Sequence, residues 1–160
     1  MKGEIVSTVT EDWVRLHGFF VRSDQPQTTA LDAAVITHGL AGNFYKSRLL
    51  TRLAEALVSV GISVVTINTR GHDYLNSTIR AGKGQPSGAA LEDVSESKFD
   101  LAGWANWLGQ QGFENVLQIG HSLGAIKGLY AQAHHPQPIV KAIAGLSATR
   151  LAHQLSLIHI

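Results

Sequence analysis

The sequence contains no cysteine, a single methionine and only four prolines among its 160 residues. The absence of cysteine excludes a disulfide framework and any thiolate metal site, and it leaves the redox compartment unspecified. No apolar run approaches the roughly 18 residues that a membrane-spanning helix needs. The first residues, MKGEIVSTVTEDW, lack a continuous apolar core and carry acidic residues early, so we expect no signal peptide and a cytoplasmic protein.

Charge is sparse and balanced. Charged residues make up 16% of the chain, and the formal net charge is +1 with neutral histidines. Because no dense block of Lys or Arg occurs, the composition gives no reason to expect nucleic acid or an anionic membrane as a partner. The hydrophobic fraction of 44% is ordinary for a soluble globular protein, and the length fits one domain with a real core. The composition does not indicate an oligomeric state.

The hydrophobic pattern predicts a hairpin followed by alternating strands and helices. Residues 5–10 and 13–22 are rich in β-branched and aromatic side chains, with Glu11 and Asp12 at the turn between them. Short apolar runs without polar alternation are typical of strands buried on both faces, and leucines at helical spacing indicate helices between them. The elements expected after the hairpin are a strand at 33–39, a helix at 49–60 ending at Gly61, a strand at 62–68, a helix at 91–111, a strand at 116–119, a helix at 123–134 and a strand at 139–147.

Repeated strand–helix units require a parallel sheet with helices on both faces. We therefore expect an α/β fold, with a mostly parallel sheet, an antiparallel N-terminal hairpin and one domain over residues 1–154. Residues 71–90, rich in Gly, Ser and Asn, are expected to form the longest irregular stretch. The segment AGKGQPSG within it lacks the strand-then-helix setting of a phosphate loop and is interpreted as a mobile loop.

One motif carries chemistry: VLQIGHSLGAIKGLY, residues 116–130, places Ser122 between Gly120 and Gly124 at a strand-to-helix turn. Such a turn lifts a serine hydroxyl above the sheet edge, and the helix start offers free N–H groups. The amide of Leu123 would then donate to an oxyanion that forms on a substrate. The alternative is that Ser122 merely caps the helix. The position of the motif favours the nucleophile.

A second loop supports this interpretation. The segment THGLAGN, residues 37–43, follows the first central strand, where the other half of an oxyanion hole would lie. A glycine there permits a sharp turn, so that the amide of Leu40, or less favourably Ala41, can point at the same place. We expect His38 to shape this loop rather than to act as a base.

Together these residues resemble the α/β-hydrolase superfamily. The His38–Gly39 loop, NTRGH at 68–72 and GHSLGA at 120–125 carry the resemblance, which covers nearly the whole chain and is strongest to the lipase, esterase and serine-aminopeptidase-like branches. The resemblance implies a serine hydrolase that acts on an ester or amide of a small molecule through an acyl-enzyme, with no cofactor and no metal. It makes Ser122 the nucleophile, and Leu40 and Leu123 the oxyanion donors.

Three departures from the family pattern limit the transfer. The loop is His-Gly-Leu-Ala-Gly rather than the glycine-rich version of many lipases, and Asp73 stands where many relatives have a second glycine. The family's acid and histidine come later in the chain, after two further strands. We therefore expect a C-terminally truncated fragment that is inactive by itself. The tail LSLIHI at 155–160 fits non-native sequence, or else the start of a helix.

Other titratable residues are expected to support the site rather than to catalyse. His121 adjoins Ser122, but neighbours on a turn point apart, so it is expected to pack or to line the pocket. For His72 and Asp73 a surface-loop role is favoured over lining the pocket. His134 and His135 end a helix, where we do not expect them to bind metal. His153 and His159 follow the last strand too soon to supply the missing base.

Two other functions stay open on the same fold, because function lives in the site. One is a non-catalytic ligand-binding protein that keeps the pocket. The other is an acyltransferase or a carbon–carbon bond hydrolase. An acid and a histidine in a longer reading frame would argue against the first. Finally, the strand at 139–147 would be an open apolar edge, so the isolated chain is expected to aggregate or to need a partner.

Overall fold

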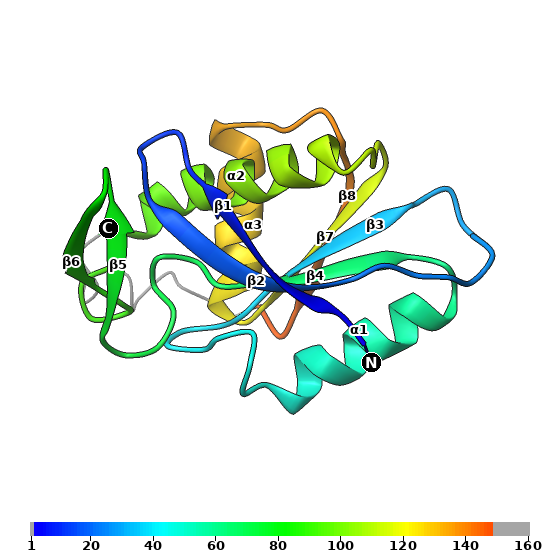
Figure 1. Ribbon diagram of the computed structural model, residues 1–160, viewed down its shortest axis with the longest axis horizontal. Helices are drawn as coiled ribbons and strands as arrows, with labels where there is room; N and C mark the ends of the chain where they lie inside the picture. Colours follow the sequence, from blue (N-terminus) through cyan, green and yellow to red (C-terminus); the bar gives the residue numbers. More distant parts are fainter. Residues whose placement is uncertain (1, 149–160) are drawn as a thin grey trace.

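The computed structural model of the chain describes residues 2–148 (Figure 1). His153, His159 and the tail at 155–160 lie outside the described residues. The elements in chain order are β1 (Glu4–Val9), β2 (Arg15–Val21), β3 (Ala33–Thr37), α1 (Arg48–Ser59), β4 (Ser63–Ile67), β5 (Asn76–Arg80), β6 (Lys83–Ser87), a short 3₁₀ helix (Val94–Glu96), α2 (Ser97–Gln110), β7 (Val116–His121), α3 (Leu123–His134) and β8 (Val140–Leu146).

The main sheet has six strands in the order β1-β2-β4-β3-β7-β8. The hairpin strand β2 pairs antiparallel with both β1 and β4, whereas β4, β3, β7 and β8 run parallel. This confirms the expected α/β class with an antiparallel N-terminal hairpin. Because the parallel strands are in register, the carboxyl ends of β3, β4 and β7 meet at one edge of the sheet. Within the described residues, no helix is long and apolar enough to cross a membrane.

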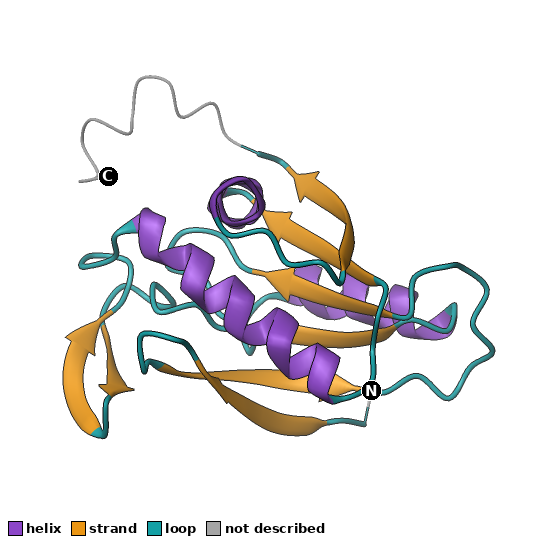
Figure 2. Cartoon of the chain, turned by 90° about the horizontal axis from the view of Figure 1, so that it is seen from above, coloured by secondary structure: helices purple, strands orange, loops and turns teal. Residues whose placement is uncertain are grey.

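Helices cover both faces of the sheet, as the unbroken apolar runs predicted. All five residues of β3 are buried, and they alternate between two separate cores. Ala33 and Val35 pack with Trp104 of α2 on one face, whereas Ile36 packs with Leu50 of α1 on the other. Figure 2 shows the same division, with α2 and α3 on the opposite side of the sheet from α1. Because helices cover both faces of the sheet, the strand ends that carry the site residues are held in place.

The predicted helix at 91–111 begins later than expected. A 3₁₀ turn starts at Val94 after Asp93, whose carboxylate accepts from the amide of Ser95 at 2.8 Å, and α2 starts only at Ser97. Glu92, the second residue of the expected helix, therefore lies before the observed one. Its carboxylate turns inward and pairs with a buried lysine instead.

The prediction of an irregular stretch at 71–90 was also wrong. Strands β5 and β6 form a separate antiparallel hairpin whose two-residue turn is Ala81-Gly82. Both turn residues have positive φ, 49° and 78°, which matches the twist of a tight hairpin. The hairpin is tied to the turn after β1, since the amide of Ala81 donates to the carbonyl of Trp13 at 3.1 Å. Gly84 and Pro86 in β6 hid this strand from a propensity argument.

A buried arginine holds the loop after β4 in place. The Arg70 guanidinium bonds to Asp100 of α2 at 2.9 Å and to Asp12 of the first turn at 2.9 Å. The Arg70 amide also donates to Asp100, at 2.8 Å. Three segments far apart in the sequence thus meet on one side chain, and the loop that follows Arg70 starts from a fixed point.

Candidate active site

Ser122 lies on a sharp turn between the end of β7 and the first residue of α3. Its backbone adopts φ 52° and ψ −120°, a conformation that residues other than glycine rarely adopt. The turn is held by two backbone bonds: the Ser122 amide donates to the Leu146 carbonyl at 2.8 Å, and the Ser122 carbonyl accepts from Ala125 at 3.0 Å. The Ser122 side chain occupies the N-cap position but makes no capping hydrogen bond. Its half-buried hydroxyl is therefore not committed to the helix, in contrast to the capping alternative.

The two glycines that flank Ser122 are there because the chain is crowded. A Cβ on Gly120 would lie 2.2 Å from the Gly124 carbonyl oxygen, and one on Gly124 would lie 2.4 Å from the His38 carbonyl oxygen. Both separations are too short for any side chain. The motif therefore brings the start of α3 directly against the loop after β3.

That loop turns sharply beside Ser122. The Gly42 amide donates to the Gly39 carbonyl at 3.0 Å, which places Leu40 and Ala41 at the two central positions of the turn. Ala41 has a φ of 50°, while the Leu40 side chain is exposed. A Cβ on Gly39 would lie 3.1 Å from Ser122 Cβ, so the turn and the serine are in van der Waals proximity. Leu123, on the other side, is the first residue of α3, where a backbone N–H has no partner within the helix.

His38 is buried behind the turn. Its Nε2 accepts from the Thr69 amide at 3.2 Å, so the neutral ring carries its proton on Nδ1, which donates to the Gly39 carbonyl at 2.7 Å. Burial, together with the nearby charge of Lys127, lowers the pKa of His38 to about 3. Both ring nitrogens are thus engaged with backbone groups, and the ring stays neutral at physiological pH.

The loop after β3 is also bonded to the loop after β4. The Phe44 amide donates to the Asn68 side chain at 3.0 Å, and the Asn43 side chain donates to the Asp73 carboxylate at 2.7 Å. The Asp73 amide donates to the Gly42 carbonyl at 2.9 Å. These bonds join the two loops at the sheet edge where Ser122 lies.

Asp73 takes part in the bonds between the loop after β3 and the loop after β4. Its φ of 53° lies in the region that favours glycine, which is why a glycine suits this position in related chains. Burial acts to raise the pKa of Asp73, but hydrogen bonds from Tyr45, His72 and Asn43 outweigh it and hold that pKa below its ordinary value. In return, burial and the Asp73 carboxylate raise the pKa of Tyr45 to about 12. The Asp73 carboxylate therefore bonds mainly to the loop after β3.

Of the residues singled out in the sequence, the fold brings Ser122, Leu123, the turn with Leu40 and the His121 ring into one cluster. A Cβ on Gly39 would lie 3.4 Å from His121 Nδ1, so His121 borders the same turn. His38 and Asp73 support that turn from behind and from the side. Among the described residues, no three His, Asp or Glu side chains are arranged to hold a metal ion.

Sequence reasoning missed three residues that complete the surroundings of the site: Thr69, Glu92 and Lys127. All three are buried, and Lys127 Nζ lies 3.1 Å from Thr69 Oγ1 and 2.5 Å from Glu92 Oε1. The sequence did contain an indication of this cluster, because Lys127 is a lone charge in an apolar helix that begins at the serine turn. A lysine among such neighbours indicates a buried partner.

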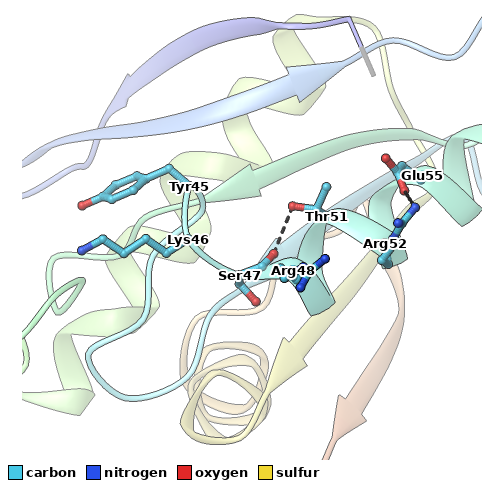
Figure 3. A pocket seen from close by; sticks show the side chains of 7 residues that line it. All are labelled: Tyr45, Lys46, Ser47, Arg48, Thr51, Arg52 and Glu55. Atoms are coloured by element: carbon cyan, nitrogen blue, oxygen red, sulfur yellow. Dashed lines mark hydrogen bonds and ion pairs between the residues drawn. The ribbon is translucent and has the colours of Figure 1, made fainter.

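Figure 3 shows the side chains that line a cavity at the end of the loop after β3. The volume of this cavity is about 260 Å³. It lies between Tyr45 and Lys46 of the loop and the first two turns of α1, where Arg52 pairs with Glu55 at 2.9 Å. Ser122 is not among its lining residues. The cavity therefore lies outside the cluster around Ser122.

Comparison with known proteins agrees with this geometry. The sequence profile described as the alpha/beta hydrolase fold matches residues 33–158. No curated protein matches the chain.

Solved structures share the fold at low identity. The Pyrococcus furiosus esterase Pf2001 is 21% identical with a TM-score of 0.63, over 84% of this chain and 48% of its own. XC6422 from Xanthomonas campestris, described as an α/β serine hydrolase without lid, is 18% identical with a TM-score of 0.67, over 92% and 62%. Est1E from Butyrivibrio proteoclasticus, solved with ferulic acid bound, is 18% identical with a TM-score of 0.65, over 86% and 51%. The chain thus spans about half the length of most of these structures, and it belongs to the α/β-hydrolase fold family.

Proposed function

We propose that Ser122 is the nucleophile of a serine hydrolase that cleaves an ester or amide of a small molecule. The observation that carries this proposal is the strained turn at Ser122, which holds an uncapped hydroxyl at the carboxyl edge of the parallel strands. Strain of this kind costs about 1–3 kcal/mol and is kept where a site needs it. Family membership, and neighbours that include an esterase and a protein with bound ferulic acid, support the same reaction class.

The proposed reaction uses the start of α3 and the turn after β3, which meet at Ser122. The Ser122 oxygen attacks the acyl carbon, its proton passes to a histidine, and the carbonyl oxygen becomes an oxyanion. The amides of Leu123 and Leu40 donate to that oxyanion. When the intermediate collapses, the bond to the leaving alcohol or amine breaks and the leaving group takes the proton. Water then releases the acid from the acyl-enzyme.

The histidine and its acid come from outside residues 2–148 in this proposal. His38 is unsuited to the role of base, because it is buried, neutral and bonded at both nitrogens. A serine hydroxyl without a base is a weak nucleophile at neutral pH, and loss of triad members costs on the order of 10⁴–10⁶ in rate. We therefore expect little turnover from the 160-residue chain alone.

The test compares the chain with a version extended by the strands that carry the acid and histidine in related proteins. Hydrolysis of p-nitrophenyl acetate and labelling by a fluorophosphonate probe are measured in both. Ser122→Ala should abolish both signals in the extended protein, while Ser7→Ala, an exposed serine on β1, should leave them unchanged.

Three outcomes would count against the proposal. Labelling of the extended protein that survives Ser122→Ala would exclude Ser122 as the nucleophile. Ligand binding without turnover in the extended protein would favour a non-catalytic binding protein. Robust Ser122-dependent turnover by the 160-residue chain would show that a base lies within it.

A further inference from the structure

A buried ion pair lies beneath the proposed oxyanion loop. The side chains of Lys127 and Glu92 are 0% and 2% exposed, and Lys127 Nζ lies 2.5 Å from Glu92 Oε1. Glu92 reaches this position because Gly71 has no side chain: a Cβ there would lie 2.0 Å from the carboxylate. The pair therefore depends on three segments that are distant in sequence.

The pair extends through hydrogen bonds to the turn beside Ser122. Lys127 Nζ donates to Thr69 Oγ1 at 3.1 Å, and the Thr69 amide donates to His38 Nε2 at 3.2 Å. His38 Nδ1 then donates to the Gly39 carbonyl at 2.7 Å. Each member of this chain is buried except Gly39, which is half-buried at the surface of the site.

The last contact fixes the turn that carries the Leu40 amide. The Gly39 carbonyl accepts from His38 and also from the Gly42 amide, at 3.0 Å, so both ends of the turn are set by one oxygen. A displacement of about 1 Å at such a position can cost 10²-fold in rate, because the donor no longer points at the oxyanion.

The chain of contacts begins on α3, at Lys127, and ends at Gly39, beside the residue that precedes α3. Ser122 precedes the first residue of α3, and Lys127 lies in its second turn. The helix thus holds the serine directly and reaches the opposite side of the site through Lys127. Stability alone is a weak reason for the ion pair, since well-packed apolar residues are often as stable or more stable in such places.

We propose that Lys127, held by Glu92, is a positioning residue that sets the Leu40 amide relative to Ser122 through Thr69 and His38. This inference rests on the proposed serine hydrolase function, and it deepens that function by naming how the oxyanion loop is held.

The first test is kinetic and uses the extended protein described above. Thr69→Val removes the hydroxyl that Lys127 contacts but keeps the backbone bond to His38. We expect kcat per folded molecule to fall about 10- to 100-fold, with KM changed less than about threefold. Thr69→Ser keeps the hydroxyl and should retain wild-type kcat, as should Lys141→Met, which removes an exposed lysine on β8.

The ion pair is tested by removing both charges. Lys127→Met alone leaves a buried, unpaired carboxylate and is expected to destabilise the fold. The double variant Glu92→Gln/Lys127→Met carries no such charge, so it should fold stably and yet show the same loss of kcat as Thr69→Val. A double variant with both wild-type stability and wild-type kcat would overturn the proposal, because the pair would then be only structural.

A spectroscopic measurement separates failure of this inference from failure of the proposed function. Nitrogen-15 spectra of the 160-residue chain report the ring tautomer of His38 and the amide environments of Leu40 and Gly42 without any catalysis. Thr69→Val should shift the signals of the His38 ring nitrogens and of both amides while the ring keeps its proton on Nδ1, whereas Ser122→Ala should leave the His38 ring signals unchanged. If Thr69→Val leaves these signals in place, the contacts do not position the loop, whether or not Ser122 is a nucleophile.

Discussion

The pKa of His38 predicts a specific loss of stability in acid. The neutral ring is buried against backbone groups, and its pKa falls from the ordinary 6.5 to about 3 through burial and the charge of Lys127. Between these two values the unfolded chain binds a proton at His38 and the folded chain does not. Linkage then requires the free energy of unfolding to rise with pH in that window and to fall as the solution is acidified.

The size of the effect follows from the same two values. One pH unit across which the unfolded state holds one extra proton is worth about 1.36 kcal/mol, so the whole difference is at most about 5 kcal/mol. Between pH 6.5 and 4.5, His38 should remove about 2–3 kcal/mol of stability. Above pH 6.5 it should contribute no slope.

The assay is urea unfolding followed by tryptophan fluorescence from pH 4.5 to 7.5, at protein concentrations where sedimentation shows monomer. His38→Gln keeps an acceptor near the Thr69 amide but does not titrate. The variant should be less stable at pH 7.5, and its stability should depend on pH less steeply, by about one proton between pH 4.5 and 6. If the two curves run parallel over this range, His38 is not the buried neutral base that the geometry describes.

Two further predictions concern the serine turn and the edge of the sheet. Ser122→Gly should stabilise the chain by about 1 kcal/mol in thermal unfolding, because glycine adopts a positive φ without strain, while Ser122→Ala should not; a less stable glycine variant would contradict the strain argument. Within the described residues β8 pairs only with β7, so the chain should associate through the free edge of β8. In sedimentation velocity, Ile143→Lys on β8 should reduce this association, whereas Leu49→Lys on α1 should not. An unsubstituted chain that is monodisperse and melts cooperatively would refute this reading of the edge.

Most of the main sheet could be predicted from the sequence because its strands are short and almost wholly apolar. Runs such as those of β3 and β4 have no polar alternation, and burial on both faces follows directly. The hairpin β5–β6 could not be found this way. Its strands carry Asn, Ser, Gly and Pro, and its turn places an alanine at a φ of 49°, so neither strand propensity nor the usual turn residues marked it.

The candidate site, too, could be predicted from the sequence only in part. The positions of Ser122 and the loop with Leu40 follow from local motifs, since Gly120 and Gly124 leave room for the tight turn from strand to helix. The network behind them depends on contacts between segments far apart in the chain. Glu92 looked like an acid at a helix start, and only the folded arrangement places it against Lys127. The local pattern around Lys127 indicates a buried partner, but it does not identify which residue that partner is.

The bond from the Ser122 amide to the Leu146 carbonyl has a consequence for the order of events during protein synthesis. The strained turn is translated well before the strand that supplies its acceptor. Until β8 has emerged and docked beside β7, the turn carries its backbone strain without this bond. A nascent chain that has only just passed residue 122 should therefore hold the serine loosely, and the geometry of the Ser122 turn would be set only after β8 has docked.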